Sequence, residues 1–193
     1  MAGEGRRKVM ISLGESFGGV VGGHDDEDFC VDHLGGIIQR MIYIGADHRG
    51  WELKAKTEKF LQGRGYEFED VGAFEYEHDD DYVDFAVWVA QGVAKNPENN
   101  RGVVICGSGV GVDVTANKVR SIRCGLGWEV DQVFEARKDD NINVLALASD
   151  NIDEEKAMRL VEKFLETEFV ESDRYLRRIE KIKRYEKEIA CGF

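Results

Sequence analysis

Residues 103–111 read VVICGSGVG, so that an apolar run passes directly into a loop with glycine at every second position. An uninterrupted apolar run bounded by glycine predicts a strand that is buried on both faces. A helix is predicted to follow from about Val112 to Val119. A buried strand, a glycine loop and a helix in this order are typical of a parallel α/β sheet.

The same alternation extends from this stretch toward both ends of the chain. Short apolar strands are predicted at 41–45, 68–71, 122–125 and 144–148, and helices at about 53–61, 86–93, 130–136, 157–165 and 173–188. Asp153 is expected to cap the helix that contains Ala157. Apolar strands that alternate with helices predict an α/β fold, in which helices cover both faces of a mostly parallel sheet.

Residues 1–40 differ in composition from the rest of the chain. They hold 9 of the 22 glycines and the acidic run 25–28, and they show neither the period of a strand nor that of a helix. Such a stretch buries little apolar surface, so we predict a mobile, glycine-rich acidic extension before a domain at 41–193. Regular structure is expected to begin at Met41, which we hypothesise to be the natural start of the protein.

The spacing of cysteine and histidine favours neither a metal site nor a disulfide framework. The four cysteines are far apart and form no C-x-x-C pair, which argues against a zinc knuckle or a disulfide scaffold. Residues 1–40 contain four side chains of metal-binding type, His24, Cys30, Asp32 and His33. A solvated acidic tail explains them better, because none of their spacings is that of a recognised ligand pair.

The 193-residue chain carries a formal net charge of −12. This excess of acidic residues argues against a general nucleic-acid binder, because no excess of Lys and Arg exists to neutralise phosphates. It leaves room for a small anion held by a local Arg cluster and by backbone N–H groups. No apolar run approaches the ~20 residues of a membrane span, and the start lacks the apolar core of a signal peptide. We therefore expect a cytoplasmic protein that binds neither nucleic acid nor membrane.

Ligands of open parallel sheets bind beyond the carboxyl ends of the strands, and the loop after Ile105 is the strongest candidate there. Backbone N–H groups between Gly107 and Gly111 can point into a shared concavity that suits an oxyanion. Cys106 precedes a helix, where a thiolate is favoured and can act as a nucleophile or a base. A tight turn with an inert buried cysteine is the alternative. The loop does not match the dinucleotide pattern G-x-G-x-x-G.

Charged side chains mark two further places. Asp47, His48 and Arg49 follow the first strand, where burial is costly without a ligand or mutual pairing. An Asp47 helix cap with exposed neighbours is the alternative. Arg174 and Arg178 lie four residues apart on one face of the last helix and could clamp a phosphate. A solvated charged helix would show the same spacing.

Several motifs occur together in an order that carries a resemblance. They are the segment 41–50, Asp81-Tyr82, the Cys106 loop with Ala116-Asn117-Lys118 behind it, Asn143-Val144-Leu145, and Arg174 with Arg178. Over about residues 41–185 the chain resembles the ribose-5-phosphate isomerase B family, which includes the galactose-6-phosphate isomerase subunits. The resemblance implies a Rossmann-like or flavodoxin-like α/β/α sandwich. It also implies an aldose–ketose isomerase of phosphorylated sugars that uses no metal or other cofactor and forms a homodimer or a dimer of dimers with shared sites.

The resemblance implies a role for each matching residue. Cys106 would be the base that moves a proton between C1 and C2 through a cis-enediolate, with Ser108 beside it. The backbone at Gly107, Gly109 and Gly111 would hold the enediolate oxygens. Substrate contacts would come from Asp47, His48, Tyr82, Asn117, Asp140, Arg174 and Arg178. Of these, His48 and the two arginines would take the phosphate, and the arginines would reach across the dimer.

One departure from the family concerns residues 139–141, which read Asp-Asp-Asn where the family usually reads His-Asn-Asp. The absent histidine is the family's acid for opening a furanose ring, so Asp139 is the candidate for this catalytic task, with His78 as a substitute. The substrate is left open between ribose 5-phosphate and a hexose 6-phosphate. Two other function classes also stay open: a non-catalytic sugar-phosphate-binding paralogue or partner subunit, and a flavodoxin-like nucleotide or redox protein.

Overall fold

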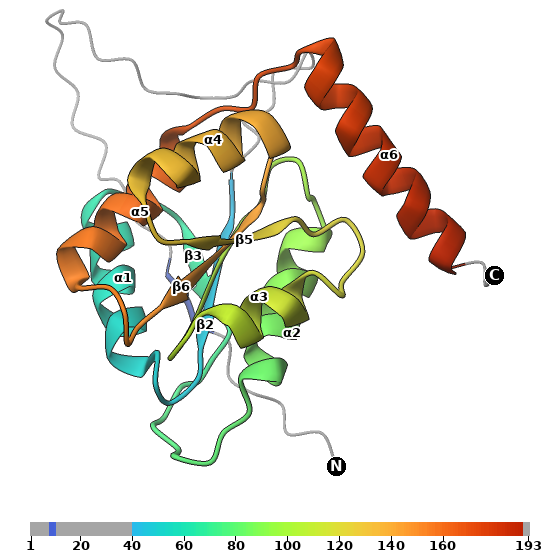
Figure 1. Ribbon diagram of the computed structural model, residues 1–193. Helices are drawn as coiled ribbons and strands as arrows, with labels where there is room; N and C mark the ends of the chain where they lie inside the picture. Colours follow the sequence, from blue (N-terminus) through green and yellow to red (C-terminus); the bar gives the residue numbers. More distant parts are fainter. Residues whose placement is uncertain (1–7, 11–39, 191–193) are drawn as a thin grey trace, which may run out of the picture.

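The computed structural model describes residues 8–10 and 40–190, which form one sheet flanked by helices (Figure 1). The strands are β1 (Lys8–Met10), β2 (Ile42–Ala46), β3 (Phe68–Asp70), β4 (Arg101–Cys106), β5 (Cys124–Gly127) and β6 (Val144–Ala148). The helices are α1 (Trp51–Gly63), α2 (Tyr82–Ala94), α3 (Val110–Ala116), α4 (Val130–Asp140), α5 (Glu154–Glu166) and α6 (Asp173–Ala190). The predicted α/β alternation is confirmed.

Five of the described strands run parallel, in the order β3-β2-β4-β6-β5. From β2 the chain first moves outward to β3, and it then returns to place β4 on the other side of β2. The direction of winding therefore reverses between β2 and β4. At such a switch point the loops that leave the two strands diverge and open a crevice at their carboxyl ends. The loops after Ala46 and Cys106 are the ones that leave the sheet at this switch point.

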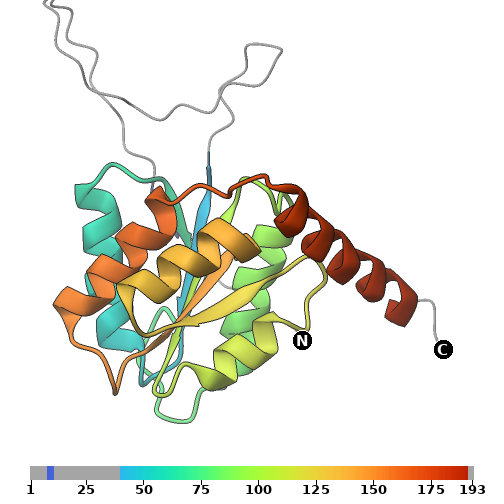
Figure 2. The same ribbon diagram turned by 45° about the horizontal axis from the view of Figure 1, so that its top comes forward.

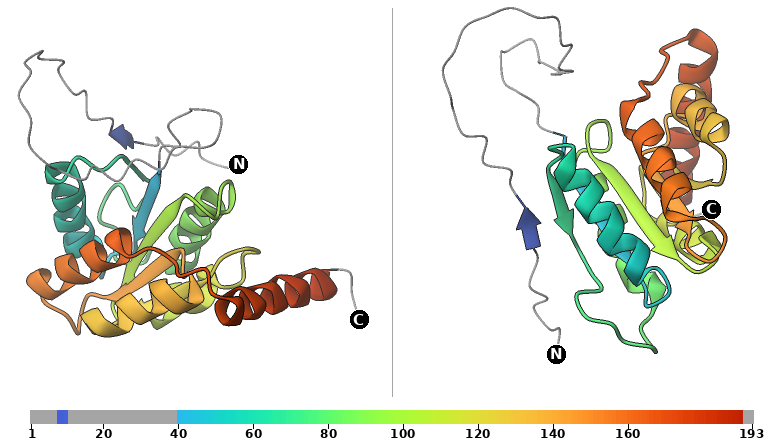
Figure 3. Two further views of the ribbon diagram at one scale, coloured as in Figure 1. Left: turned by 90° about the horizontal axis from the view of Figure 1, so that it is seen from above. Right: turned by 90° about the vertical axis from the view of Figure 1, so that its left-hand side faces the viewer.

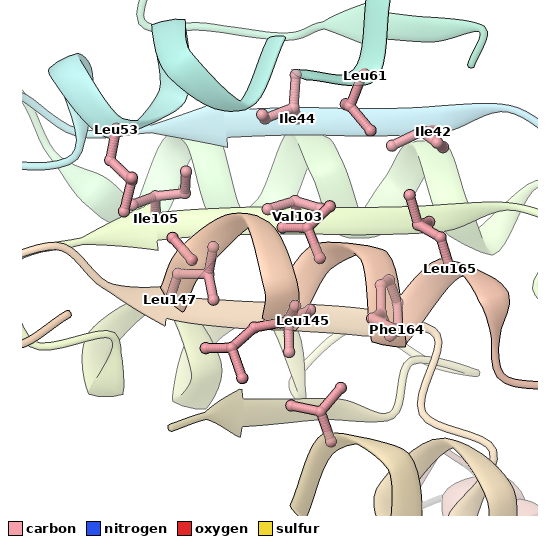
Figure 4. Packing of buried hydrophobic residues seen from close by; sticks show 14 of the residues in the cluster. Ile42, Ile44, Leu53, Leu61, Val103, Ile105, Leu145, Leu147, Phe164 and Leu165 are labelled. Atoms are coloured by element: carbon pink, nitrogen blue, oxygen red, sulfur yellow. The ribbon is translucent and has the colours of Figure 1, made fainter. Parts of the chain in front are cut away.

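Helices cover both faces of the sheet, which gives the predicted three layers (Figures 2 and 3). On one face α1, α4 and α5 pack on a cluster that contains Ile44, Ile105 and Leu147, and Figure 4 shows how these side chains interlock. On the other face α2 and α3 pack on a cluster that contains Val104 and Ala146. Successive residues of β4 enter opposite clusters, which explains why its sequence does not alternate with polar residues.

Residues 8–10 depart from the expectation that regular structure begins at Met41. They pair antiparallel with β3 at the edge of the sheet, with Lys8 opposite Asp70 and Met10 opposite Phe68. Three residues are too few to display a period of two, so the sequence pattern could not reveal this strand. Residues 1–7 and 11–39 of the predicted extension, which include its four side chains of metal-binding type, lie outside the described residues.

Helix α4 is one turn longer than predicted and ends at Asp140 instead of Ala136. The missed turn contains Arg137, which is only 1% exposed. Its guanidinium donates to the carbonyl oxygens of Thr167 and Ile142 at 3.2 and 2.7 Å. These bonds replace the water that the charged group loses, so a polar residue occupies a position that the apolar pattern could not mark. Asp139 and Asp140 consequently lie in a helix rather than in a loop.

Helix α6 extends away from the three layers (Figures 1 and 2). Its base packs near α4 and buries Ile179. Four other apolar side chains are 39–57% exposed, namely Leu176, Ile182, Tyr185 and Ile189. Within the described residues, no helix combines the length and the apolar character needed to cross a membrane.

Candidate active site

The loops after β2, β4 and β6 meet at the switch point. The backbone nitrogen of Asp47 donates to the carbonyl oxygen of Ile105 at 3.3 Å, which joins the first two loops where their strands end. Ser149 donates from its backbone nitrogen and from Oγ to the carbonyl oxygen of Cys106, at 3.0 and 3.2 Å. Three loops that leave the carboxyl edge of the sheet are therefore bonded to one another around Cys106.

Cys106 is the last residue of β4 and is 4% exposed. Its Sγ accepts a hydrogen bond from the backbone nitrogen of Gly109 at 3.2 Å. Gly109 reaches this position with φ of +72°, a left-handed conformation that glycine adopts without steric cost. This hydrogen bond fixes the position of the sulfur at the entrance of the glycine loop. The loop geometry thus suits a base at Cys106.

Ser108, Gly111 and Tyr82 form the outer side of the same loop. Ser108 is exposed, and its Oγ accepts a hydrogen bond from the backbone nitrogen of Val110 at 3.4 Å. A Cβ atom added to Gly111 would lie 2.7 Å from the Tyr82 ring, so the aromatic ring packs directly on the loop backbone. Tyr82 begins α2, and Asp81 caps this helix through its carboxylate. Two elements that are distant in sequence therefore place a half-exposed phenol beside the Cys106 loop.

Arg49, which the sequence marks only as one of three charged residues after the first strand, pairs with Asp150, which the sequence pattern does not single out. The guanidinium of Arg49 lies against Gly107 and forms an ion pair with the carboxylate of Asp150. The backbone nitrogen of Asp150 donates to the carbonyl oxygen of Gly107 at 3.0 Å. Both side chains are largely exposed, so the pair contributes little to stability. The Arg49–Asp150 ion pair nevertheless joins the loop after β2 to the loop after β6 beside Gly107.

Asp47 and His48 lie together at the end of β2, each held by a different part of the chain. Oδ1 of Asp47 accepts a hydrogen bond from the backbone nitrogen of Gly50 at 2.9 Å. Burial raises the pKa of the Asp47 carboxyl above its ordinary value. Oδ1 of Asp80 accepts from the backbone nitrogen of His48 at 3.0 Å and lies 2.7 Å from its Nδ1. The sequence pattern does not reveal Asp80, because nothing in the acidic run 79–81 shows which carboxylate turns inward.

His78 lies beside the same imidazole. Its ring stacks on that of His48, with centroids 5.3 Å apart and planes at 23°. Nδ1 of His78 pairs with Oδ1 of Asp79 at 2.8 Å, and both of these side chains are highly exposed. The structure thus brings the predicted substitute acid to the edge of the sheet where Cys106 lies.

Asn117 follows the last residue of α3 at the amino edge of the sheet, opposite the Cys106 loop. Its Oδ1 accepts from the backbone nitrogen of Cys124 at 2.9 Å, and its Nδ2 donates to the carbonyl oxygen of Cys124 at 3.0 Å. Both ends of the side-chain amide are used to join α3 to β5. The structure gives Asn117 a place in the fold and does not bring it to the predicted substrate site.

Asp139 and Asp140 also lie at the amino edge, because α4 ends there before β6 begins. A hydrogen bond to Asp139 raises the pKa of Tyr175 at the base of α6. Arg174 and Arg178 are exposed on the same helix. Within one chain, the structure does not bring any of these four predicted site residues to the Cys106 loop.

Comparison with known proteins matches most of the chain to one family. Residues 42–182 match the family described as Ribose/Galactose Isomerase. Ribose-5-phosphate isomerase B of Mycobacterium tuberculosis is 35% identical over 146 residues, which make up 76% of this chain and 90% of that protein.

Solved structures give the same result. Ribose-5-phosphate isomerase B from Mycoplasma genitalium with bound ribulose-5-phosphate superimposes with a TM-score of 0.74 at 40% identity, over 77% of this chain and 97% of that one. Type B ribose 5-phosphate isomerase of Trypanosoma brucei has a TM-score of 0.70 at 33% identity, over 77% and 99%. The chain belongs to the ribose/galactose isomerase family and is an aldose–ketose isomerase of sugar phosphates.

Proposed function

We propose that this chain interconverts ribose 5-phosphate and ribulose 5-phosphate, with Cys106 as the base. The observation that carries the proposal is the Cys106 thiol, which ends a strand at the switch point and accepts a hydrogen bond from Gly109. The relatives compared above are named for ribose 5-phosphate, and the chain covers 90–99% of their lengths. A hexose 6-phosphate is the alternative substrate within the same reaction class.

The reaction moves a proton between C1 and C2, which requires a base together with stabilisation of a developing oxyanion. The Cys106 thiolate would remove the proton, leave a cis-enediolate, and return the proton to the neighbouring carbon. The backbone from Gly107 to Gly111 would hold the enediolate oxygens, and the exposed hydroxyl of Ser108 would relay their protons. Asp47 and Tyr82 flank the loop and would contact the sugar hydroxyls.

A second copy of the chain would complete the site. Arg174 and Arg178 carry the charge that a phosphate needs, yet they belong to α6, which extends away from the three layers (Figure 1). The exposed apolar side chains of α6 are typical of a surface that another subunit covers. We therefore propose a homodimer or a dimer of dimers, in which the arginines bind the phosphate in the partner's site. Asp140 would approach the partner's substrate from the same edge.

The test is a coupled assay of the purified protein against pentose and hexose phosphates. We expect turnover of ribose 5-phosphate and a loss of about 10²–10⁴-fold in Cys106→Ala, the range for general acid–base catalysis. Cys124→Ala, which removes the other free cysteine of the described residues, should keep its activity. Unchanged turnover in Cys106→Ala would refute the role of Cys106.

A non-catalytic sugar-phosphate-binding subunit is the second candidate, and Asp139 in place of histidine is the observation that favours it. Calorimetric binding of pentose phosphates without turnover across the whole panel would support it. Family membership leaves no support for the flavodoxin-like redox protein. We also propose a cytoplasmic location, which rests on the free thiols of Cys106 and Cys124.

A further inference from the structure

Strand β1 lies outside the part of the chain that matches the isomerase family. The match covers residues 42–182, whereas β1 spans Lys8–Met10. This strand pairs with β3, the outermost of the five parallel strands on its side of the sheet. The backbone groups along an uncovered edge strand bind other extended segments. We propose that the edge of β3 is a strand-docking site whose occupant is Lys8–Met10, and that docking positions the segment 72–82 at the substrate site.

The hydrogen bonds between β2 and β3 show which backbone groups of β3 face the opposite edge. The backbone nitrogen of Ile42 donates to the carbonyl oxygen of Glu67 at 3.2 Å, and that of Val71 donates to the carbonyl oxygen of Ile44 at 2.9 Å. Backbone groups of successive residues in a strand point alternately to its two sides. The odd-numbered residues of this stretch therefore bond β2, and the even-numbered residues turn toward β1.

The register shows which residues of β1 meet these groups. In the antiparallel pair Met10 lies opposite Phe68, and Lys8 lies opposite Asp70. Residues that face each other at such positions exchange two hydrogen bonds, and the positions between them exchange none. The N–H groups of Lys8 and Met10 consequently turn toward β3, whereas that of Val9 turns away from it. Docking therefore depends on two particular N–H groups, and single substitutions can test each of them.

Asp70 connects the docking edge with the end of the neighbouring strand. Its Oδ1 accepts a hydrogen bond from the backbone nitrogen of Gly72 at 2.9 Å. The carbonyl oxygen of Gly72 accepts from the backbone nitrogen of Ala46 at 2.9 Å, and the backbone nitrogen of Ala73 donates to the carbonyl oxygen of Ala46 at the same distance. The carboxyl end of β3 is thereby bonded to the last residue of β2, directly before Asp47.

The segment 72–82 begins at these bonds and ends in the candidate site. It carries Asp80, whose Oδ1 lies 2.7 Å from Nδ1 of His48, and Tyr82, whose ring packs on the glycine loop after β4. Residues 74–79 are all exposed. A stretch with exposed side chains has little packing of its own, so its position depends on how its two ends are held. Strand β3 holds the first end, and α2 holds the second.

Charge favours Lys8–Met10 over a second copy of the chain as the occupant. Residues 6–8, which include the first residue of β1, read Arg-Arg-Lys, whereas β3 contains Glu69 and Asp70. Opposite charges on two pairing segments favour their association. The β3 edge of a second copy would bring the same two carboxylates to this place, and like charges across a strand pair are destabilising.

Amide hydrogen exchange of the full chain, measured by NMR, tests the docking. In the wild type the amides of Phe68 and Asp70 should be protected, as should that of Val71, which bonds β2. Met10→Pro removes an N–H group that turns toward β3. We expect the first two amides to exchange about tenfold faster, as the loss of one or two hydrogen bonds allows, and Val71 to remain protected. Val9→Pro is the matched control, because an edge strand tolerates proline where its nitrogen faces away from the sheet.

Steady-state kinetics of the same proteins tests the positioning role, which rests on the proposed isomerase function. For Met10→Pro we expect the KM for ribose 5-phosphate to rise by about 2–30-fold, the range over which remote contacts alter a site, with kcat nearly unchanged. Val9→Pro should keep both constants at the wild-type level. Lys8→Pro removes the other N–H group and should act like Met10→Pro, which keeps the inference testable if one variant folds poorly.

Several results would overturn the inference. Rapid exchange of Phe68 and Asp70 in the wild type would show that β1 does not occupy the edge. Equal responses of Met10→Pro and Val9→Pro would show that docking does not use the expected N–H groups. A lower melting temperature with an unchanged KM would limit β1 to a stabilising role. Slow exchange in Met10→Pro together with a doubled mass in light scattering would make a second copy the occupant. Wild-type protein without turnover would count against the proposed function and would leave the exchange test intact.

Discussion

Nζ of Lys54 lies 2.7 and 2.8 Å from the two carboxylate oxygens of Asp70 and donates at 2.6 Å to the carbonyl oxygen of Ala73. Both side chains are buried. Lys54 belongs to α1, which follows the loop of Asp47 and His48, whereas Ala73 begins the segment that leads to Asp80. The ion pair therefore joins the two stretches of chain that must come together for Asp80 to hold His48.

Replacing Lys54 by methionine should destabilise the fold strongly. The change leaves the Asp70 carboxylate buried without its cation, and removing one partner of a buried pair costs about 3–5 kcal/mol of unfolding free energy. Urea denaturation measures this loss. Lys56→Met is the matched control on the same helix, because its ion pair with Glu154 is exposed and worth less than about 1 kcal/mol. Similar losses of unfolding free energy in the two variants would contradict the expectation that burial makes the Lys54 ion pair the more costly one to break.

The sequence pattern predicted most of the fold because most of the fold depends on apolar burial. Strands such as 144–148 and the helix capped by Asp153 are confirmed almost to the residue. The pattern failed where a polar group takes a structural position. Arg137 extends α4 by bonding carbonyl oxygens, and β5 begins two residues late because Arg123 bonds the side chain of Asn143 instead of entering the strand.

The sequence predicted those residues of the candidate site that lie at the ends of strands, because the apolar pattern shows where strands end. Cys106, Asp47 and His48 each follow an apolar strand directly, and the topology of a parallel sheet brings such positions together. Asp80 and Asp150 could not be found in this way. Their contacts to His48 and Arg49 span 32 and 101 residues of sequence, so only the folded chain shows them.

Replacing Gly111 by alanine should separate activity from stability. Gly111 lies in the first turn of α3, where alanine is favoured over glycine by about 0.5–1 kcal/mol. The new Cβ would lie 2.7 Å from the Tyr82 ring, which is half exposed and can move outward. We expect an unchanged or slightly higher melting temperature together with a raised KM, because Tyr82 leaves its place at the sugar. Gly63→Ala is the control, since no atom lies within 4 Å of its added Cβ. A lower melting temperature with normal KM would contradict this account.

Asp47→Asn should increase stability at neutral pH and lower activity. Burial raises the pKa of Asp47 in the folded protein above its unfolded value, so the ionised carboxylate destabilises the fold at pH 7. As the pH falls through the folded pKa, the group takes up a proton and this penalty disappears. Asparagine carries no such penalty and can keep the hydrogen bond from Gly50. The stability difference between Asp47→Asn and wild type, measured by urea denaturation, should therefore be largest at neutral pH and vanish below the ordinary pKa of 3.8. A difference that grows on acidification would contradict the direction of the shift.

The two free cysteines of the described residues should differ in reactivity. Burial and the neighbouring Asp113 carboxylate raise the pKa of Cys124 well above its ordinary value, so this thiol stays protonated at pH 8. The thiolate is the reactive form toward iodoacetamide, and Cys124 should remain unlabelled until urea unfolds the chain. Cys106 receives the Gly109 N–H group at its sulfur, and alkylation should modify it first and abolish turnover. Peptide mass mapping after timed labelling distinguishes the two sites.

Saturating ribulose 5-phosphate should slow the labelling of Cys106, because a base that removes the substrate's proton is covered when the substrate is bound. Labelling of Cys106 at an equal rate with and without substrate would place the sugar elsewhere.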